Sequence, residues 1–227
     1  PIPVPLGFHQ SPMKPIIHPT AIIGPNVTIE DDVFIGPYCV IGTHAEYRSK
    51  VNERTDEPGR VFIGRGTTIR EFVTVHGSAI GKTTHIGPGC YIQAHAHIGH
   101  DAYLDGYNTI ACHAIVAGHV TMWMHSGLGL AAVTHQGARI EHGTFIGASA
   151  FFKGGSAPFK IYAGVPARPI GTNVRLAKAL RDQGQGILVP RWLDELLDRN
   201  PTGSTPSSHP QHTPPEPPDV PPCDPSL

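Results

Sequence analysis

Residues 86–104 read IGPGCYIQAHAHIGHDAYL and place an aliphatic side chain at every sixth position, at Ile86, Ile92, Ile98 and Leu104. The same spacing extends beyond this stretch, with one polar member, in the run Ile80, Ile86, Ile92, Ile98, Leu104, Ile110, Val116, Met122, Leu128, Thr134, Ile140, Ile146 and Phe152. Two shorter runs precede it: Ile23, Ile29, Ile35 and Ile41, and then Ile63, Ile69 and Val75.

A six-residue period is neither the 3.6 of an α-helix nor the 2 of an ordinary strand. It fits a chain that turns a corner once per hexad, so that three hexads close one triangular coil. The aliphatic side chains then point inward, glycine or asparagine relieves the corners, and successive coils stack as parallel strands about 4.8 Å apart. The sequence therefore predicts an all-β solenoid, a left-handed parallel β-helix of hexapeptide repeats, with a short C-terminal helical segment.

The places where the period begins, lapses and ends divide the chain into segments. These are an N-terminal extension at 1–17, the β-helix at 18–153 with an inserted polar loop at 43–60, an irregular exit strap with short helices at 154–200, and a disordered Pro-rich tail at 201–227. Apolar residues at helical spacing predict helices at about 173–183 and 190–199. Between Val75 and Ile80 one residue is missing from the hexad, which places His76 at an irregular corner.

Composition and charge exclude several classes of protein. The formal net charge is -1 and Lys and Arg form no long run, so we expect no nucleic-acid partner. The four cysteines are widely spaced without a Cys-x-x-Cys pair, which indicates neither a zinc knuckle nor a disulfide framework. No stretch reaches the roughly 18 apolar residues of a membrane span, and residues 1–13 lack a signal-peptide pattern. We therefore expect a soluble, cytoplasmic protein.

A coil of about 18 residues places every eighteenth residue at the same corner, one coil higher. His100, Gly118 and Gln136 have this spacing, and the same edge carries His97, Asp101, His119 and His135. Most of the 15 histidines in the chain are expected to be structural or solvated. Their concentration at one edge of a rigid scaffold nevertheless predicts a catalytic groove.

The pair His100-Asp101 is the sharpest feature of this edge. A carboxylate beside an imidazole can fix its orientation and keep it basic, as a general base near neutral pH requires. Adjacent strand residues point to opposite faces, so the pairing needs a corner at this point. Gly118 offers a backbone N–H for a developing oxyanion, although an ordinary corner glycine explains it equally well.

Four segments at these positions resemble the UDP-N-acetylglucosamine O-acyltransferase family that begins lipid A biosynthesis. They are Ile69–His76 (IREFVTVH), Ala96–Asp101 (AHIGHD), Val116–His119 (VAGH) and Ala132–Gln136 (AVTHQ), in the family's order. The resemblance implies transfer of an acyl group from an acyl carrier protein thioester to the 3-hydroxyl of UDP-N-acetylglucosamine or a related nucleotide sugar. It also implies a homotrimer with active sites between neighbouring columns, and no cofactor or metal.

The same resemblance implies the roles of individual residues. His100 is the base that takes the proton of the sugar hydroxyl, Asp101 supports it, and the Gly118 N–H stabilises the tetrahedral oxyanion. The resemblance assigns substrate binding to a further set: His76, His97, His119, His135, Gln136 and Asn173.

Some residues depart from the family pattern. After Asn173, this chain has Arg175 and Ala179 where the family has a glutamate and an arginine. The strap Ile161–Ile170 (IYAGVPARPI) is more similar to hexapeptide acetyltransferases that use acetyl-CoA. A related sugar, or a shorter acyl group carried by coenzyme A, is therefore an alternative.

Two other functions share the predicted fold. The γ-class carbonic anhydrases bind zinc through three histidines, and His76, His95 and His100 have a similar spacing that would leave an open coordination position. The Arg-x-Asp expected ahead of them is missing, and Asp101 and His119 are left without a role. A trimeric scaffold without chemistry is the other alternative, although stability alone does not require a base, a carboxylate and a backbone donor at one edge.

Overall fold

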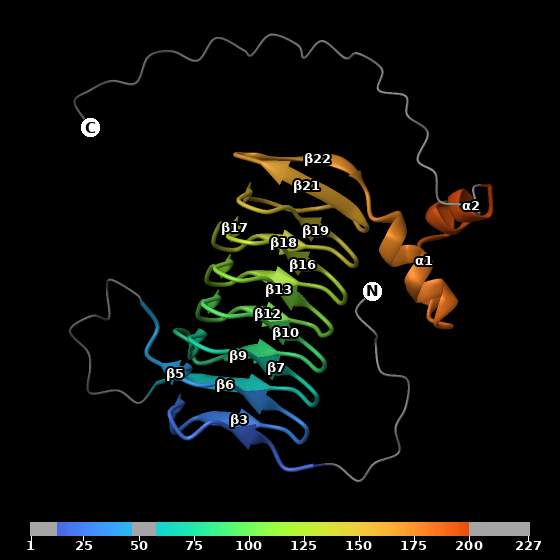
Figure 1. The fold of residues 1–227 in the computed structure, drawn as a ribbon. Helices are drawn as coiled ribbons and strands as arrows, with labels where there is room; N and C mark the ends of the chain where they lie inside the picture. Colours follow the sequence, from blue (N-terminus) through green and yellow to red (C-terminus); the bar gives the residue numbers. More distant parts are fainter. Residues whose placement is uncertain (1–12, 47–57, 200–227) are drawn as a thin grey trace, which may run out of the picture.

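The structure, a computed structural model, describes residues 13–46 and 58–199, and these form a three-sided column of stacked coils followed by a hairpin and helices (Figure 1). Within the described residues the first face contains β1 (Ile16–Ile17), β4 (Phe34–Ile35), β7 (Thr68–Ile69), β10 (Tyr91–Ile92), β13 (Thr109–Ile110), β16 (Gly127–Leu128), β19 (Phe145–Ile146), β21 (Lys160–Gly164) and β22 (Ala167–Thr172).

The second face contains β2 (Ile22–Ile23), β5 (Val40–Thr43), β8 (Thr74–His76), β11 (His97–Ile98), β14 (Ile115–Val116), β17 (Val133–Thr134) and β20 (Phe151–Phe152). The third face contains β3 (Val27–Ile29), β6 (Arg60–Ile63), β9 (Thr83–Ile86), β12 (Tyr103–Leu104), β15 (Thr121–Met122) and β18 (Arg139–Ile140). All pairs between coils are parallel, which confirms the predicted left-handed parallel β-helix.

The register of the strands follows the hexads over most of the column. His97 pairs with Ile115 and Ile115 with Val133, so each coil there adds 18 residues. From Ile35 onward most of the inward hexad residues are buried in one continuous core, as the period predicts, and the half-buried Ile23 and Ile29 of the first coil pack against it. Thr134, the polar member, is 1% exposed, and its hydroxyl accepts from the Ala117 N–H and donates to the Ile115 carbonyl. This buried hydroxyl is therefore fully used.

The prediction for Val75 to Ile80 is wrong. Ile80 is 55% exposed and lies in the corner between β8 and β9 instead of in the core. The next aliphatic hexad position after Val75 is Ile86, eleven positions later instead of six, because this corner carries five extra residues. The dipeptide Ile80-Gly81 has the composition of a repeat. For this reason the sequence suggested one missing residue at a corner that in fact contains five extra ones.

The corners also differ from the expectation that glycine or asparagine relieves them. His95 and His113 have positive φ angles of 61° each. Their rings stack 4.8 Å apart, and His95 stacks at 4.8 Å on Phe72, which also has a positive φ. Stacking between flat rings on successive coils offsets the cost of the left-handed backbone.

Both ends of the column differ in detail from the predicted boundaries. β1 already pairs with β4, so the column includes residues 16 and 17. Residues 160–172 lie in the predicted irregular exit strap, but β21 and β22 form an antiparallel hairpin there that extends the first face. The expected inserted loop leaves β5 after Thr43 and returns at β6, with residues 47–57 outside the described part. The predicted tail at 201–227 and residues 1–12 of the predicted extension also lie outside it.

The predicted C-terminal helices are present as α1 (Val174–Asp182), a 3-10 turn at Gly186–Leu188 and α2 (Arg191–Arg199). They pack around a second apolar cluster formed by Phe159, Ala177, Leu180, Val189, Leu193 and Leu197. No helix in the described ranges is both long and apolar enough to cross a membrane.

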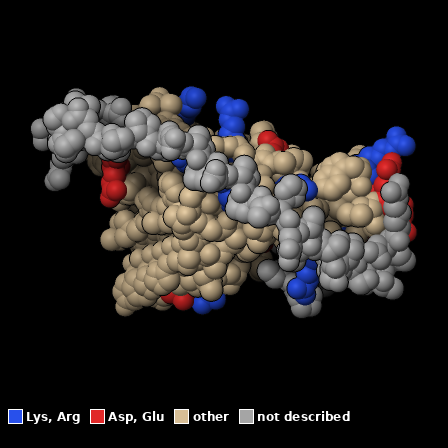
Figure 2. Space-filling model, turned by 90° about the horizontal axis from the view of Figure 1, so that it is seen from above, with Lys and Arg blue, Asp and Glu red and all other residues tan. Residues whose placement is uncertain are grey.

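Two expectations from composition can be compared with the described residues. Cys39, Cys90 and Cys112 are free thiols, as their wide spacing predicts. On the face of the molecule seen in Figure 2, Lys and Arg side chains lie at separate points and do not gather into a basic patch.

Candidate active site

The corner between the second and third faces carries the predicted catalytic residues on successive coils. The His119 N–H donates to the His100 carbonyl at 2.9 Å, and the Gly137 N–H donates to the Gly118 carbonyl at 2.9 Å. These two bonds fix the vertical order of three coils, which hold His100, then Gly118, then Gln136. The register predicted from the sequence is therefore present at this edge.

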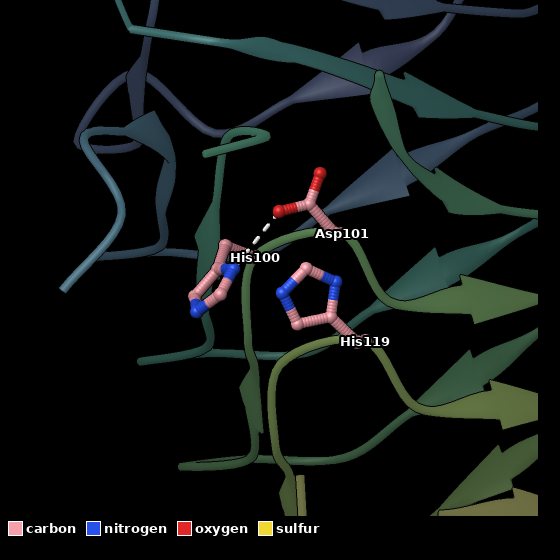
Figure 3. Close-up of side chains that lie close together, drawn as sticks. All are labelled: His100, Asp101 and His119. Atoms are coloured by element: carbon pink, nitrogen blue, oxygen red, sulfur yellow. Dashed lines mark hydrogen bonds and ion pairs between the residues drawn. The ribbon is translucent and has the colours of Figure 1, made fainter. Parts of the chain in front are cut away.

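The side chains of His100 and Asp101 form a hydrogen-bonded pair (Figure 3). Nδ1 of His100 lies 2.9 Å from Oδ2 of Asp101. The two side chains are 9% and 2% exposed. Asp101 has a positive φ of 58°, and this tight turn brings neighbouring side chains together that a strand would separate. The corner required by the sequence argument is thus observed.

Asp101 is held by two further groups that the sequence reasoning missed. The Ser78 hydroxyl donates to Oδ1, and the Ala79 N–H donates to Oδ2 at 2.9 Å. Burial raises the pKa of Asp101, but the hydrogen bonds from Ser78, His100 and Ala79 outweigh it and leave this pKa below its usual value. Asp101 is therefore a carboxylate at neutral pH.

The ionised state of Asp101 fixes the tautomer of His100. A carboxylate only accepts hydrogen bonds, so the Nδ1 atom of His100 must carry a proton and donate it. In the neutral imidazole this leaves the lone pair on Nε2. Nε2 is therefore the basic nitrogen of the pair.

The His100 ring lies directly against Gly118. A Cβ atom built on Gly118 would come within 2.7 Å of Nε2 and 2.8 Å of Cε1. Any larger residue at 118 would therefore displace the ring. Among the residues that the structure describes, the Gly118 N–H has no hydrogen-bond acceptor. A backbone donor next to a basic nitrogen suits a reaction in which a proton leaves and an oxyanion forms.

His119 completes the group drawn in Figure 3, with its ring perpendicular to that of His100 and 4.9 Å from it. Potential ligand atoms of His100, Asp101 and His119 lie within 4.8 Å of one another, which would allow a metal ion. The Asp101 oxygens, however, already accept from Ser78, Ala79 and His100. The donor set therefore fits an oriented base better than a metal site.

His76 and His97 extend the site along the second face. Their rings meet edge to face at 4.7 Å, and Nδ1 of His97 lies 2.8 Å from the Thr74 hydroxyl. Burial lowers the pKa of both imidazoles below 6.5, against a raising effect of Glu46, and each is lowered further by nearby imidazoles. Both rings are therefore mainly neutral at pH 7.

The remaining predicted binding residues fall in two places. His135 and Gln136 are exposed on the coil above Gly118, and Nδ1 of His135 donates to the Gln136 carbonyl at 3.0 Å. Asn173 instead caps α1, where its Oδ1 accepts from the Leu176 N–H and its Nδ2 donates to the Gly143 carbonyl. Gly143 lies at the corner between the third and first faces. A single chain therefore does not bring Asn173 to the edge of His100.

Within one chain, the three histidines of the carbonic anhydrase alternative, His76, His95 and His100, do not lie together at one site. His95 lies at the corner between the first and second faces, stacked between Phe72 and His113. The cluster of potential metal ligands found among the described residues contains His100 but neither His76 nor His95.

Comparisons with known proteins agree with this geometry. Residues 14–43 match the family model described as bacterial transferase hexapeptide (six repeats). An acyl-[acyl-carrier-protein]--UDP-N-acetylglucosamine O-acyltransferase of Paraburkholderia phymatum is 31% identical over 219 residues, covering 81% of this chain and 83% of the relative. The protein of the same name from Paraburkholderia phytofirmans is 33% identical over 203 residues, covering 74% and 76%.

Solved structures support the fold. The UDP-N-acetylglucosamine acyltransferase from Campylobacter jejuni has a TM-score of 0.61 at 22% identity, covering 83% of this chain and 86% of that one. The UDP-N-acetylglucosamine O-acyltransferase from Moraxella catarrhalis has a TM-score of 0.58 at 24% identity, covering 82% and 92%. At these identities the likeness is one of architecture. Together with the sequence relatives, it leads to one conclusion: the chain belongs to the acyl-[acyl-carrier-protein]–UDP-N-acetylglucosamine O-acyltransferase family.

Proposed function

We propose that this chain transfers an acyl group from an acyl carrier protein thioester to the 3-hydroxyl of UDP-N-acetylglucosamine or a related nucleotide sugar. The observation that carries the proposal is the ordered series of contacts from Asp101 through His100 to Gly118. The series orients a basic nitrogen beside a backbone donor. Membership of the O-acyltransferase family supports the substrates.

In the proposed reaction, Nε2 of His100 takes the proton of the sugar hydroxyl while the oxygen attacks the thioester carbonyl carbon. The new C–O bond gives a tetrahedral intermediate whose oxyanion accepts from the Gly118 N–H. The intermediate then collapses, the C–S bond breaks, and the imidazolium returns the proton to the leaving sulfur. Asp101 stabilises the imidazolium throughout and stays ionised. Every proton and electron pair is accounted for without a cofactor.

The surrounding polar residues are proposed to bind the substrates: His76, His97, His119, His135 and Gln136. Asn173 lies on a different corner, so its proposed contact with the nucleotide requires a neighbouring copy of the chain. This requirement supports the proposal that the protein acts as a homotrimer with active sites between columns. A cytoplasmic location is part of the same proposal.

The test uses the purified protein with UDP-N-acetylglucosamine and acyl carrier protein thioesters, with product mass measured by mass spectrometry. We expect an acylated nucleotide sugar, and a rate about 10²- to 10⁴-fold lower in His100→Asn. His113→Asn is the matched control, because that exposed ring lies at another corner and contacts His95.

Other outcomes identify the alternatives. Product formed only with acetyl-CoA would assign coenzyme A as the donor and refute the carrier-protein proposal. Stoichiometric zinc that is lost from a His76, His95 and His100 triple variant would favour the carbonic anhydrase reading. Equal rates in His100→Asn and wild type would refute the proposed base.

A further inference from the structure

We infer that Ser78 is a positioning residue for the reaction: its hydroxyl holds the Asp101 carboxylate in the orientation that aims the His100 base. The inference rests on the proposed function and adds a residue to it. Ser78 is 7% exposed, and its hydroxyl donates a hydrogen bond to the Asp101 carboxylate. Neither the period nor the matching segments included this serine.

The neighbours of the Ser78 hydroxyl determine which hydrogen bond it donates and which it accepts. Its oxygen accepts from the Ile80 N–H at 3.3 Å, and its O–H donates to Oδ1 of Asp101, which can only accept. The other oxygen, Oδ2, accepts from both the Ala79 N–H and Nδ1 of His100. Because Ser78 and Ala79 each hold one oxygen, the plane of the carboxylate is fixed.

The backbone that carries Ser78 is itself held in place. The Gly77 N–H donates to the Thr43 carbonyl at 2.8 Å, and the Arg60 guanidinium donates to the Gly81 carbonyl at 3.1 Å. A Cβ on Gly59 would lie 1.9 Å from the Ser78 carbonyl oxygen, so this close approach requires glycine there. The serine is thus delivered by a packed corner and has little freedom to move.

Removing the hydroxyl changes both the orientation and the proton affinity of the pair. Without Ser78, Oδ1 loses its donor, so the carboxylate can rotate and His100 is aimed less well. Loss of a hydrogen bond to the charged form also raises the apparent pKa of the coupled Asp101–His100 pair. We therefore expect Ser78→Ala to lower kcat by about tenfold to a hundredfold. The acidic limb of the kcat/KM profile should move to higher pH by about half a unit.

The experiment measures kcat, KM and the pH profile of kcat/KM for wild type, Ser78→Ala and Ser78→Thr. Threonine keeps the hydroxyl, and we expect it to restore the acidic limb and most of kcat. The control is Ser126→Ala, because Ser126 is also a buried corner serine, with its hydroxyl bonded to the Trp123 carbonyl and to Asn108. This substitution should lower stability but leave the pH profile unchanged.

The outcomes separate the inference from the proposed function. No acylated product from wild type refutes the proposed function. An active wild type with an unchanged pH profile and kcat in Ser78→Ala refutes the role of Ser78 alone. If Ser78→Ala does not fold, the comparison of Ser78→Thr with Ser78→Cys decides, because cysteine is a weak donor of similar size. Equal pH profiles in these two variants then overturn the inference.

Discussion

Replacing Gly118 with alanine tests whether the His100 ring and the next coil act as one unit. The added Cβ would lie 2.7 Å from Nε2, whereas ordinary van der Waals contact begins at 3.4 Å. The imidazole must therefore move by about 0.7 Å, since the neighbouring backbone is fixed by the coil. The backbone N–H at residue 118 remains, so the substitution changes the position of the base and keeps the oxyanion donor.

A displacement of about 1 Å at a reacting group can cost about 100-fold in rate. We therefore expect kcat of Gly118→Ala to fall by roughly 100-fold, which is about 2.7 kcal/mol of activation free energy. Overpacking costs about 1–3 kcal/mol of stability, so folding must be checked by circular dichroism and urea unfolding.

The assay measures product formation by mass spectrometry under saturating substrates, beside the control Gly155→Ala. Gly155 follows β20 and pairs with Arg139 on the third face, and a Cβ there meets no atom within 4 Å. The control should retain wild-type kcat. A folded Gly118→Ala protein with wild-type kcat would refute the contact between His100 and Gly118 and, with it, the placement of the base.

Three further variants test the contacts assigned to individual side chains. Burial holds the pKa of His76 and His97 below 6.5, so the unfolded chain takes up protons first as pH falls, and the free energy of unfolding should decrease below about pH 6.5. Urea unfolding between about pH 7.5 and 5 should show a smaller decrease in the double variant His76→Gln, His97→Gln; an unchanged slope would contradict this. Thr134→Val removes both hydrogen bonds of its hydroxyl and leaves the Ala117 N–H unpaired, so urea unfolding should show a loss of about 1–3 kcal/mol; a neutral effect would contradict the assigned bonds. Asn173→Ala removes the cap of α1 and should cost about 1 kcal/mol in the same assay, whereas equal stability would show that the cap is dispensable.

The height of each residue in the column could be predicted from the sequence because inward positions repeat. Ile98 is fully buried, and the pairing of His97 with Ile115 follows the spacing of 18. Counting hexads therefore placed Gly118 above His100 without any knowledge of side-chain contacts. The sequence also predicted a corner at His100-Asp101, because these two side chains can pair only where the chain turns, and the positive φ of Asp101 agrees with this.

The contacts from outside the repeat could not be predicted in this way. The six-residue period gives positions only for residues within the repeats, so it gives no position for a segment that leaves the column and returns. The corner after His76 contains Ile80-Gly81, which has the composition of a repeat, and this similarity hid the segment that holds Ser78. The corner that Asn173 occupies could not be predicted for a different reason, since its match to the family gives no information about its position around the column.

The two interruptions of the period nevertheless contain information about the site, because they occur at one edge. Ile41 and Ile63 are 22 positions apart, and Val75 and Ile86 are 11 apart, where one hexad requires 6. Both gaps lie between the second and third faces, on the coils directly before His100. The Asp101 carboxylate of the catalytic pair accepts hydrogen bonds from donors that lie in these extra residues. The second interruption provides them as the Ser78 hydroxyl and the Ala79 N–H, and from the first the charge of Glu46 acts on His76 and His97. In this fold, therefore, hexad spacing gives the height of a site, and the edge at which insertions recur gives its side of the column.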